Sequence, residues 1–67
     1  MTGIELKTWV ESANIKHRKL ARKLERSIGT LYNWYNSTKP LPRLIVFAVA
    51  YLGCEKAKAE LDAENAA

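Results

Sequence analysis

One stretch constrains the fold of this chain more than any other: residues 17–36, HRKLARKLERSIGTLYNWYN. Its apolar residues recur at helical spacing in two groups, first Leu20, Ala21 and Leu24, then Leu31 and Trp34. Between the groups Glu25 and Arg26 interrupt the pattern, and the Ser27 hydroxyl is well placed to cap a second helix. The stretch therefore predicts two short helices, over residues 17–24 and 28–36, joined by a tight turn.

Residues in both predicted helices carry a family resemblance. The small Ala21 would let the two helices cross closely, and Leu31 and Trp34 would anchor the second helix in the core. Together His17, Ala21, Leu24, Leu31 and Trp34 resemble the helix-turn-helix DNA-binding domains of the phage lambda repressor and Cro type. The likeness covers roughly residues 3–53. It departs where His17 replaces a usual glutamine, Glu25 a usual glycine and Arg26 a usual small aliphatic residue.

The resemblance implies an all-α fold, a compact bundle of four to five helices around a central helix-turn-helix. We expect a DNA-binding domain over residues 1–53 and a C-terminal helical extension over residues 54–67 with a frayed end. In the family, the residue at the His17 position touches a DNA phosphate, and the positions of Ser27, Ile28, Gly29, Tyr32 and Asn33 face the bases.

Positive charge is concentrated in the middle of the chain. Residues 16–43 hold eight basic residues and one acidic residue, a net charge of +7, while the whole chain carries only +4. Because electrostatic attraction is screened beyond roughly 10 Å, this distribution favours a local surface that binds a polyanion. The expected phosphate contacts are Lys16, His17, Arg18, Lys19, Arg22, Lys39 and Arg43. The alternative is an ordinary solvated surface, although no acidic residues alternate with these bases as helical ion pairs would favour.

The outer side of the second of these helices, residues 28–36, is almost uncharged. It mixes methyl, hydroxyl and amide groups, and these are the groups that contact base edges in the major groove. The expected base contacts are Ser27, Ile28, Gly29, Thr30, Tyr32, Asn33 and Asn36. The alternatives are that Ile28 completes the core, that Tyr32 packs on the first helix of the chain, and that Asn33 is merely solvated.

A capping box opens the first helix of the chain. Thr2 and Glu5 have the required spacing, and an apolar face follows at i, i+3, i+4 and i+7, formed by Leu6, Trp9, Val10 and Ala13. The pattern predicts a helix of about eleven residues. Asn14 can adopt the left-handed conformation that ends such a helix, and Ile15 would then pack on the core.

The segment from Leu44 to Leu52 is apolar on all sides. It predicts a fourth helix with Pro42 as its first residue and Gly53 at its end. So small a domain covers only one side of this helix, so we expect a fifth helix or a second subunit on the rest. A fifth helix would bury Cys54, Ala57 and Leu61 and carry the i, i+4 pairs Lys56–Glu60 and Lys58–Asp62. The expected homodimer would pack through Ile45, Val46, Val49 and Leu61.

Several function classes are disfavoured by composition. One cysteine and one histidine cannot form a disulfide within the chain or fill a metal site, and no catalytic constellation is visible, so we expect neither an enzyme nor a cofactor. No small-molecule ligand is evident. The longest apolar run is far shorter than the roughly 20 residues that span a bilayer, and no leader is present. We therefore expect a protein of the cytoplasm, associated with the nucleoid or the host cell, without a membrane partner.

The leading hypothesis is a protein that binds double-stranded DNA sequence-specifically, a small transcriptional repressor such as a phage or another mobile element carries. An excisionase or architectural DNA-bending factor could use the same fold. A hypothesis from another class is a protein-interaction module that docks a partner on the apolar fourth helix. The hypothesis of membrane-surface binding is less favoured, because the basic helix has too little apolar face to insert into a membrane.

Overall fold

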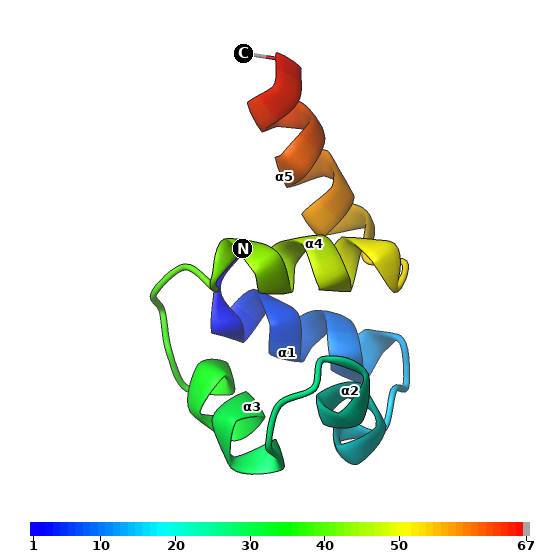
Figure 1. The fold of residues 1–67 in the computed structure, drawn as a ribbon, viewed down its shortest axis with the longest axis vertical. Helices are drawn as coiled ribbons and strands as arrows, with labels where there is room; N and C mark the ends of the chain where they lie inside the picture. The colour runs from blue at the N-terminus through cyan, green and yellow to red at the C-terminus, as the bar shows by residue number, and fades with distance from the viewer. Residues whose placement is uncertain (67) are drawn as a thin grey trace.

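Five helices make up the described part of the chain, residues 1–66, in the computed structural model (Figure 1). They are α1 (Gly3–Ser12), α2 (His17–Lys23), α3 (Ile28–Tyr35), α4 (Arg43–Tyr51) and α5 (Glu55–Ala66). The expected all-α class is confirmed. In Figure 1, α5 rises from the end of α4, and α2 and α3 lie at the opposite end of the molecule.

The predicted start of α1 is confirmed. The Glu5 amide donates to the Thr2 hydroxyl over 3.2 Å, and the Thr2 amide donates to the Glu5 carboxylate over 3.0 Å, which completes the capping box. Leu6 and Val10 are fully buried. Ala13 is exposed, so its expected place on the apolar face is wrong: the helix has already ended at Ser12 and Ala13 is its C-cap.

Three helices end in the same way. After α1, α2 and α4 the residue beyond the C-cap has a positive φ, 57° at Asn14, 55° at Glu25 and 112° at Gly53. In each case the amides of this residue and the next donate to carbonyls in the last turn of the helix, for example Arg26 to Ala21 over 3.0 Å after α2. This is the Schellman pattern, which glycine favours because it has no Cβ. The expected ends at Asn14 and Gly53 are confirmed.

All five helices contribute to one core. Its largest fully buried side chains are Leu6, Val10, Leu20, Leu31, Val49 and Cys54. Ala57 at the start of α5 is also fully buried, and Leu61 and Ile15 pack against the cluster from its edge. The expected inner face of α5 is therefore confirmed, and the segment after Gly53 shares the core of the rest of the chain.

The expectations for α4 need correction. Pro42 is the N-cap of α4 and the first helical residue is Arg43. Ile45, Val46 and Val49, expected at a homodimer interface, are 4%, 6% and 0% exposed because they face the core of their own chain. Leu61 is half-buried against the same core and is not freely exposed either. The apolar side chains that α4 leaves exposed are Leu44, Phe47 and Tyr51.

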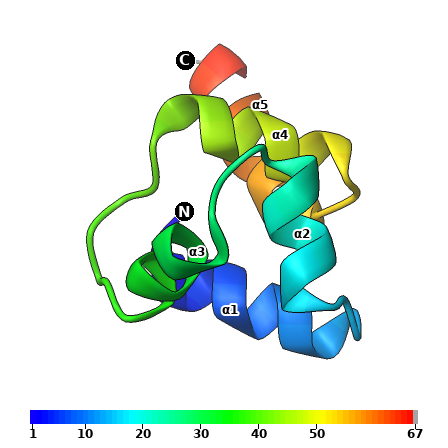
Figure 2. The same cartoon turned by 60° about the horizontal axis from the view of Figure 1, so that its bottom comes forward.

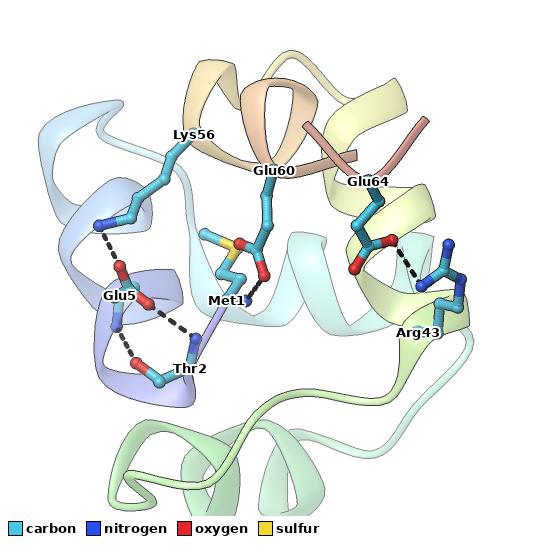
Figure 3. A network of polar contacts seen from close by, with 7 residues as sticks. All are labelled: Met1, Thr2, Glu5, Arg43, Lys56, Glu60 and Glu64. Atoms are coloured by element: carbon cyan, nitrogen blue, oxygen red, sulfur yellow. Dashed lines mark hydrogen bonds and ion pairs between the residues drawn. The ribbon is translucent and has the colours of Figure 1, made fainter. Parts of the chain in front are cut away.

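Ion pairs tie α5 to the rest of the chain (Figure 3). Lys56 pairs with Glu5 of α1, Glu60 with the amino group of Met1, and Glu64 with Arg43 of α4. These contacts replace the expected pairs within α5: Lys56 reaches α1 instead of Glu60, and Lys58–Asp62 is not among the ion pairs of the described residues.

The Lys56–Glu5 contact has an electrostatic consequence. The hydrogen bond from Lys56, assisted by the Thr2 amide, lowers the pKa of Glu5 from 4.5 to about 2. The Glu5 carboxylate therefore caps the N-terminus of its own helix and also pairs with Lys56 in the first turn of α5.

α5 is helical to Ala66, the expected fraying of the last residues stays a prediction, and Ala67 lies outside the described residues. Among residues 1–66, no helix has both the length and the apolar character needed to cross a membrane.

Candidate nucleic-acid interface

A four-residue connection, Leu24 to Ser27, joins α2 to α3, and the two helices lie next to each other at one end of the molecule (Figure 2). The predicted pair of short helices is confirmed to within one residue at each C-terminal end. The Ser27 hydroxyl accepts a hydrogen bond from the Thr30 amide over 3.2 Å, which confirms it as the cap of α3. Glu25 holds the turn in the left-handed conformation usually reserved for glycine.

The inner face of α3 differs from the expected one. Leu31 is fully buried as predicted, but its partner in the core is Tyr35, which is 5% exposed, whereas Trp34 is only half-buried. Tyr35 follows Leu31 by four residues and so lies on the same face of the helix. Trp34 sits at the edge of this face, where its backbone carbonyl meets α1.

The outer face of α3 presents four of the expected base contacts to solvent: Gly29, Tyr32, Asn33 and Asn36. The Asn36 amide donates to the backbone carbonyl of Tyr32 over 3.1 Å, so this group is already engaged. Within the described residues no hydrogen bond holds the Asn33 side chain. Asn33 and Tyr32 are thus the large polar side chains on α3 that remain available to an incoming partner.

Three further expected base contacts are more restricted. Ile28 is half-buried and packs against the core, as its alternative interpretation held. The hydroxyls of Ser27 and Thr30 lie 2.9 Å apart and hydrogen-bond to each other at the start of α3. These two hydroxyls could therefore bind a partner only through the lone pairs or protons that their mutual hydrogen bond does not use.

The basic side chains of α2 divide into two rows. Lys19 and Lys23, one turn apart, line a depression of about 450 Å³ together with Lys16 and with Leu52 from the end of α4. Arg18 and Arg22 do not line it. Each arginine is the next residue after His17 or Ala21 and so lies about 100° further round the helix. His17 is the residue of α2 that contacts α3. Arg18 and Arg22 line a second depression, of about 280 Å³, together with Lys16 and Lys19, so the two rows form one continuous basic surface on α2.

The other two expected phosphate contacts lie outside α2. Lys39 is exposed in the connection between α3 and α4. Arg43 is engaged elsewhere: its guanidinium pairs with Glu64 and lies 5.5 Å from the centre of the Phe47 ring. The structure therefore brings Lys16, Lys19, Arg18 and Arg22 together on α2, places His17 against α3, and engages Arg43 with α5 instead.

His17 makes the most specific contact between α2 and α3. Its Nδ1 lies 2.9 Å from the Tyr35 hydroxyl, and its ring packs edge-on against Tyr35 and Tyr32 with ring centres 5.3 and 5.8 Å apart. Burial raises the pKa of Tyr35 to about 12, so its hydroxyl stays protonated at neutral pH. Tyr35 is not among the expected site residues, although its four-residue spacing from Leu31 places it on the inner face of the helix.

Other site chemistries have no matching cluster. In the part of the chain that the structure describes, no group of three or more His, Cys, Asp or Glu side chains is arranged to hold a metal ion. Cys54 is a free thiol, and it is fully buried in the core.

Comparison with known proteins does not extend this picture. No protein-family model matches the chain, and neither a curated protein nor a solved structure matches it.

Proposed function

We propose that the chain binds double-stranded DNA sequence-specifically, with α3 in the major groove and α2 across the phosphate backbone. The observation that carries the proposal is the packing of α2 against α3, which joins a helix with an exposed basic face to a helix with an exposed, uncharged polar face. In DNA-binding proteins, charged residues often hold the phosphates. Neutral amides and hydroxyls often contact the base edges. The resemblance of residues 17–36 to lambda repressor and Cro domains supports the same arrangement.

The structure refines the proposed contacts. Asn33 and Tyr32 are the best candidates for base contacts, because they are exposed and free of competing side-chain hydrogen bonds among the described residues. Gly29 would let the groove wall approach the helix closely, since only the Ser27 oxygen, 4.0 Å away, lies near its Cβ direction. His17, Arg18 and Arg22 would hold phosphates, and Lys16 and Lys19 would add attraction from the adjoining flank of α2.

We propose that the chain acts as a homodimer, but through a different set of residues from those expected. Leu44, Phe47 and Tyr51 follow the spacing i, i+3, i+7 along one face of α4 and are 76%, 46% and 91% exposed. A stripe of this kind marks an interaction surface, and the proposed binding to a palindromic site calls for a second copy of the chain as its partner. Two copies would present two α3 helices to the two halves of a palindromic site.

The proposed biological role is repression by steric exclusion, in the cytoplasm of a cell that carries a phage or another mobile element. Occupied DNA would exclude polymerase or another DNA-binding protein. The exposed stripe of α4 also favours a second candidate, an interaction module that docks a different protein there, since an exposed apolar stripe marks an interaction surface without specifying its partner.

Selection of duplexes from random DNA, followed by footprinting and a bending assay, tests the proposal. A repressor should select one pseudo-palindromic site and protect it without a large bend. An architectural factor would instead protect repeats in phase with the helix and bend them. Failure to enrich any duplex, together with affinity that does not fall with salt, would contradict DNA binding and leave the interaction module.

A further inference from the structure

The imidazole of His17 is held by α3 through its inner edge. Nδ1 lies 2.9 Å from the hydroxyl of Tyr35, while no hydrogen bond engages Nε2, on the opposite edge, among residues 1–66. The His17 ring is half-exposed, whereas Tyr35 is 5% exposed. The ring therefore has one edge bound to the core of the protein and one edge available to a partner.

The burial of Tyr35 favours its hydroxyl as the donor in this hydrogen bond. The Tyr35 hydroxyl carries a proton that needs an acceptor, because a buried hydroxyl that donates to nothing is unfavourable. Within the described residues, His17 Nδ1 is the only hydrogen-bond partner of this hydroxyl. With Tyr35 as the donor and Nδ1 as the acceptor, the proton of the neutral imidazole resides on Nε2.

We propose that Tyr35 is a positioning residue for DNA binding: its hydroxyl fixes His17 in the tautomer whose Nε2–H donates a hydrogen bond to a DNA phosphate. The inference rests on the proposed function and deepens it by naming the chemical form of one contact. A fixed Nε2–H donor orients the protein on the backbone. Arg18 and Arg22 supply charge on the neighbouring flank, so the two kinds of contact have different roles.

The same contact links phosphate to base recognition. Phosphate contacts set the register of a protein on the duplex. The His17 ring also packs against Tyr32, with 5.8 Å between ring centres, and Tyr32 is one of the exposed side chains on the outer face of α3. A fixed His17 thus holds the phosphate contact and the outer face of α3 in one arrangement.

Nitrogen NMR of the imidazole tests the tautomer directly. His17 is the sole histidine of the chain, so its two ring nitrogens are assigned without ambiguity. At alkaline pH the wild-type protein should show Nε2–H as the dominant tautomer. Tyr35→Phe should give a mixture, and Tyr51→Phe, which removes the same hydroxyl from an exposed tyrosine of α4, should leave the spectrum unchanged. An Nδ1–H tautomer in the wild-type protein, or no change in Tyr35→Phe, would overturn the proposal.

DNA titrations test the positioning role. Tyr35→Phe should lower affinity about three- to tenfold, as expected for one weakened hydrogen bond, and leave the salt dependence unchanged because no charge is lost. In the His17→Ala background Tyr35→Phe should cost nothing further, since its effect acts through His17. Additive losses would show that Tyr35 acts structurally and would overturn the proposal.

The two readouts separate the two inferences. A wild-type protein that binds no duplex would overturn the proposed function and remove the phosphate partner. The tautomer of the wild-type protein tests the action of Tyr35 on His17 whether or not DNA binds, and it needs no substitution.

Discussion

A Cβ atom at Gly3 would lie 1.5 Å from the carbonyl oxygen of Trp34, so the first turn of α1 packs directly on the backbone of α3. The obstacle is main chain and cannot rotate away as a flexible side chain would. Glycine at this position therefore sets how closely α1 approaches the helix that we propose to read DNA.

The first prediction follows from this contact. Gly3→Ala should destabilise the fold by about 3 kcal/mol or more, because the two helices must move apart to relieve the overlap. Gly29→Ala is the matched control: its Cβ would meet nothing nearer than 4.0 Å, and alanine favours a helix by up to about 1 kcal/mol. Urea denaturation of both variants checks the contrast. Equal effects at the two glycines would contradict the close packing of α1 on α3.

The second prediction concerns the turn between α2 and α3. Glu25 has a φ of 55°, a conformation that costs a residue with a Cβ about 1–2 kcal/mol. Because the Glu25 side chain makes no hydrogen bond or ion pair among the described residues, Glu25→Gly should raise the free energy of unfolding by about 1 kcal/mol. Asn14→Gly should raise the free energy of unfolding by less, since asparagine tolerates the left-handed region better than glutamate does. Thermal denaturation would measure both, and a lower midpoint for Glu25→Gly would argue against this turn geometry.

The third prediction concerns stability at acid pH. The pKa of Glu5 is lowered from 4.5 to about 2 by Lys56 and the Thr2 amide, so the folded protein binds fewer protons at this site than the unfolded chain does. The contribution of Glu5 to stability is therefore fully present above pH 4.5 and is lost as the pH falls towards 2.

Melting temperatures across this range would test the assignment. The wild-type midpoint should fall more steeply than that of Glu5→Gln, which lacks the ionised partner at every pH. Glu11→Gln, an exposed change on the same helix, should follow the wild-type curve. Parallel curves for the wild-type protein and Glu5→Gln would mean that the contact between α1 and α5 contributes little.

Features that depend on neighbouring residues in the chain were predictable from the sequence. The Thr2–Glu5 capping box, the Ser27 cap and the helix ends at Asn14 and Gly53 are formed by residues within a few positions of each other. Their hydrogen bonds are decided locally, so residue type and spacing suffice to predict them. The same holds for the helices on either side of the turn at Glu25.

Features that depend on packing between distant segments were not predictable. Only the fold brings Gly3 to the Trp34 carbonyl, and no residue type or spacing indicates that contact. Likewise the apolar pattern of α4 does not show which of its sides faces the core, so it does not distinguish buried Val49 from exposed Leu44. The division of the α2 bases into two rows also required the positions of α3 and α4.

The fourth prediction concerns the proposed homodimer. A charge at Leu44 or Tyr51 should weaken self-association about tenfold or more, because it would be buried without a partner. Both side chains are more than three-quarters exposed in the single chain, so Leu44→Glu and Tyr51→Glu should leave its fold intact. Ile4→Glu changes an exposed apolar residue of α1, outside the stripe, and serves as the control. Sedimentation at micromolar concentration measures the effect, and a wild-type monomer both free and on its best DNA site would rule out the dimer.

The fifth prediction separates phosphate contacts from base contacts. Arg18→Gln or Arg22→Gln should weaken binding to all duplexes together and reduce the salt slope by about 0.9 for each phosphate contact that is lost. Asn33→Ala should instead cost about 1–3 kcal/mol on the preferred site and leave binding to scrambled DNA almost unchanged, because the lost contact is to a base edge. Both arginines and Asn33 are exposed, so the fold should persist in all three variants.

A remote charge provides the control for these titrations. Lys58→Gln removes one positive charge from an exposed position on α5, at the end of the molecule opposite α2 and α3, so it should change the salt slope much less than either arginine variant does. Cognate and scrambled duplexes at two salt concentrations, with circular dichroism to confirm folding, complete the measurement. If Lys58→Gln matched Arg18→Gln, net charge rather than a phosphate contact would explain binding. If Asn33→Ala weakened both duplexes equally, α3 would not be the helix that distinguishes one sequence from another.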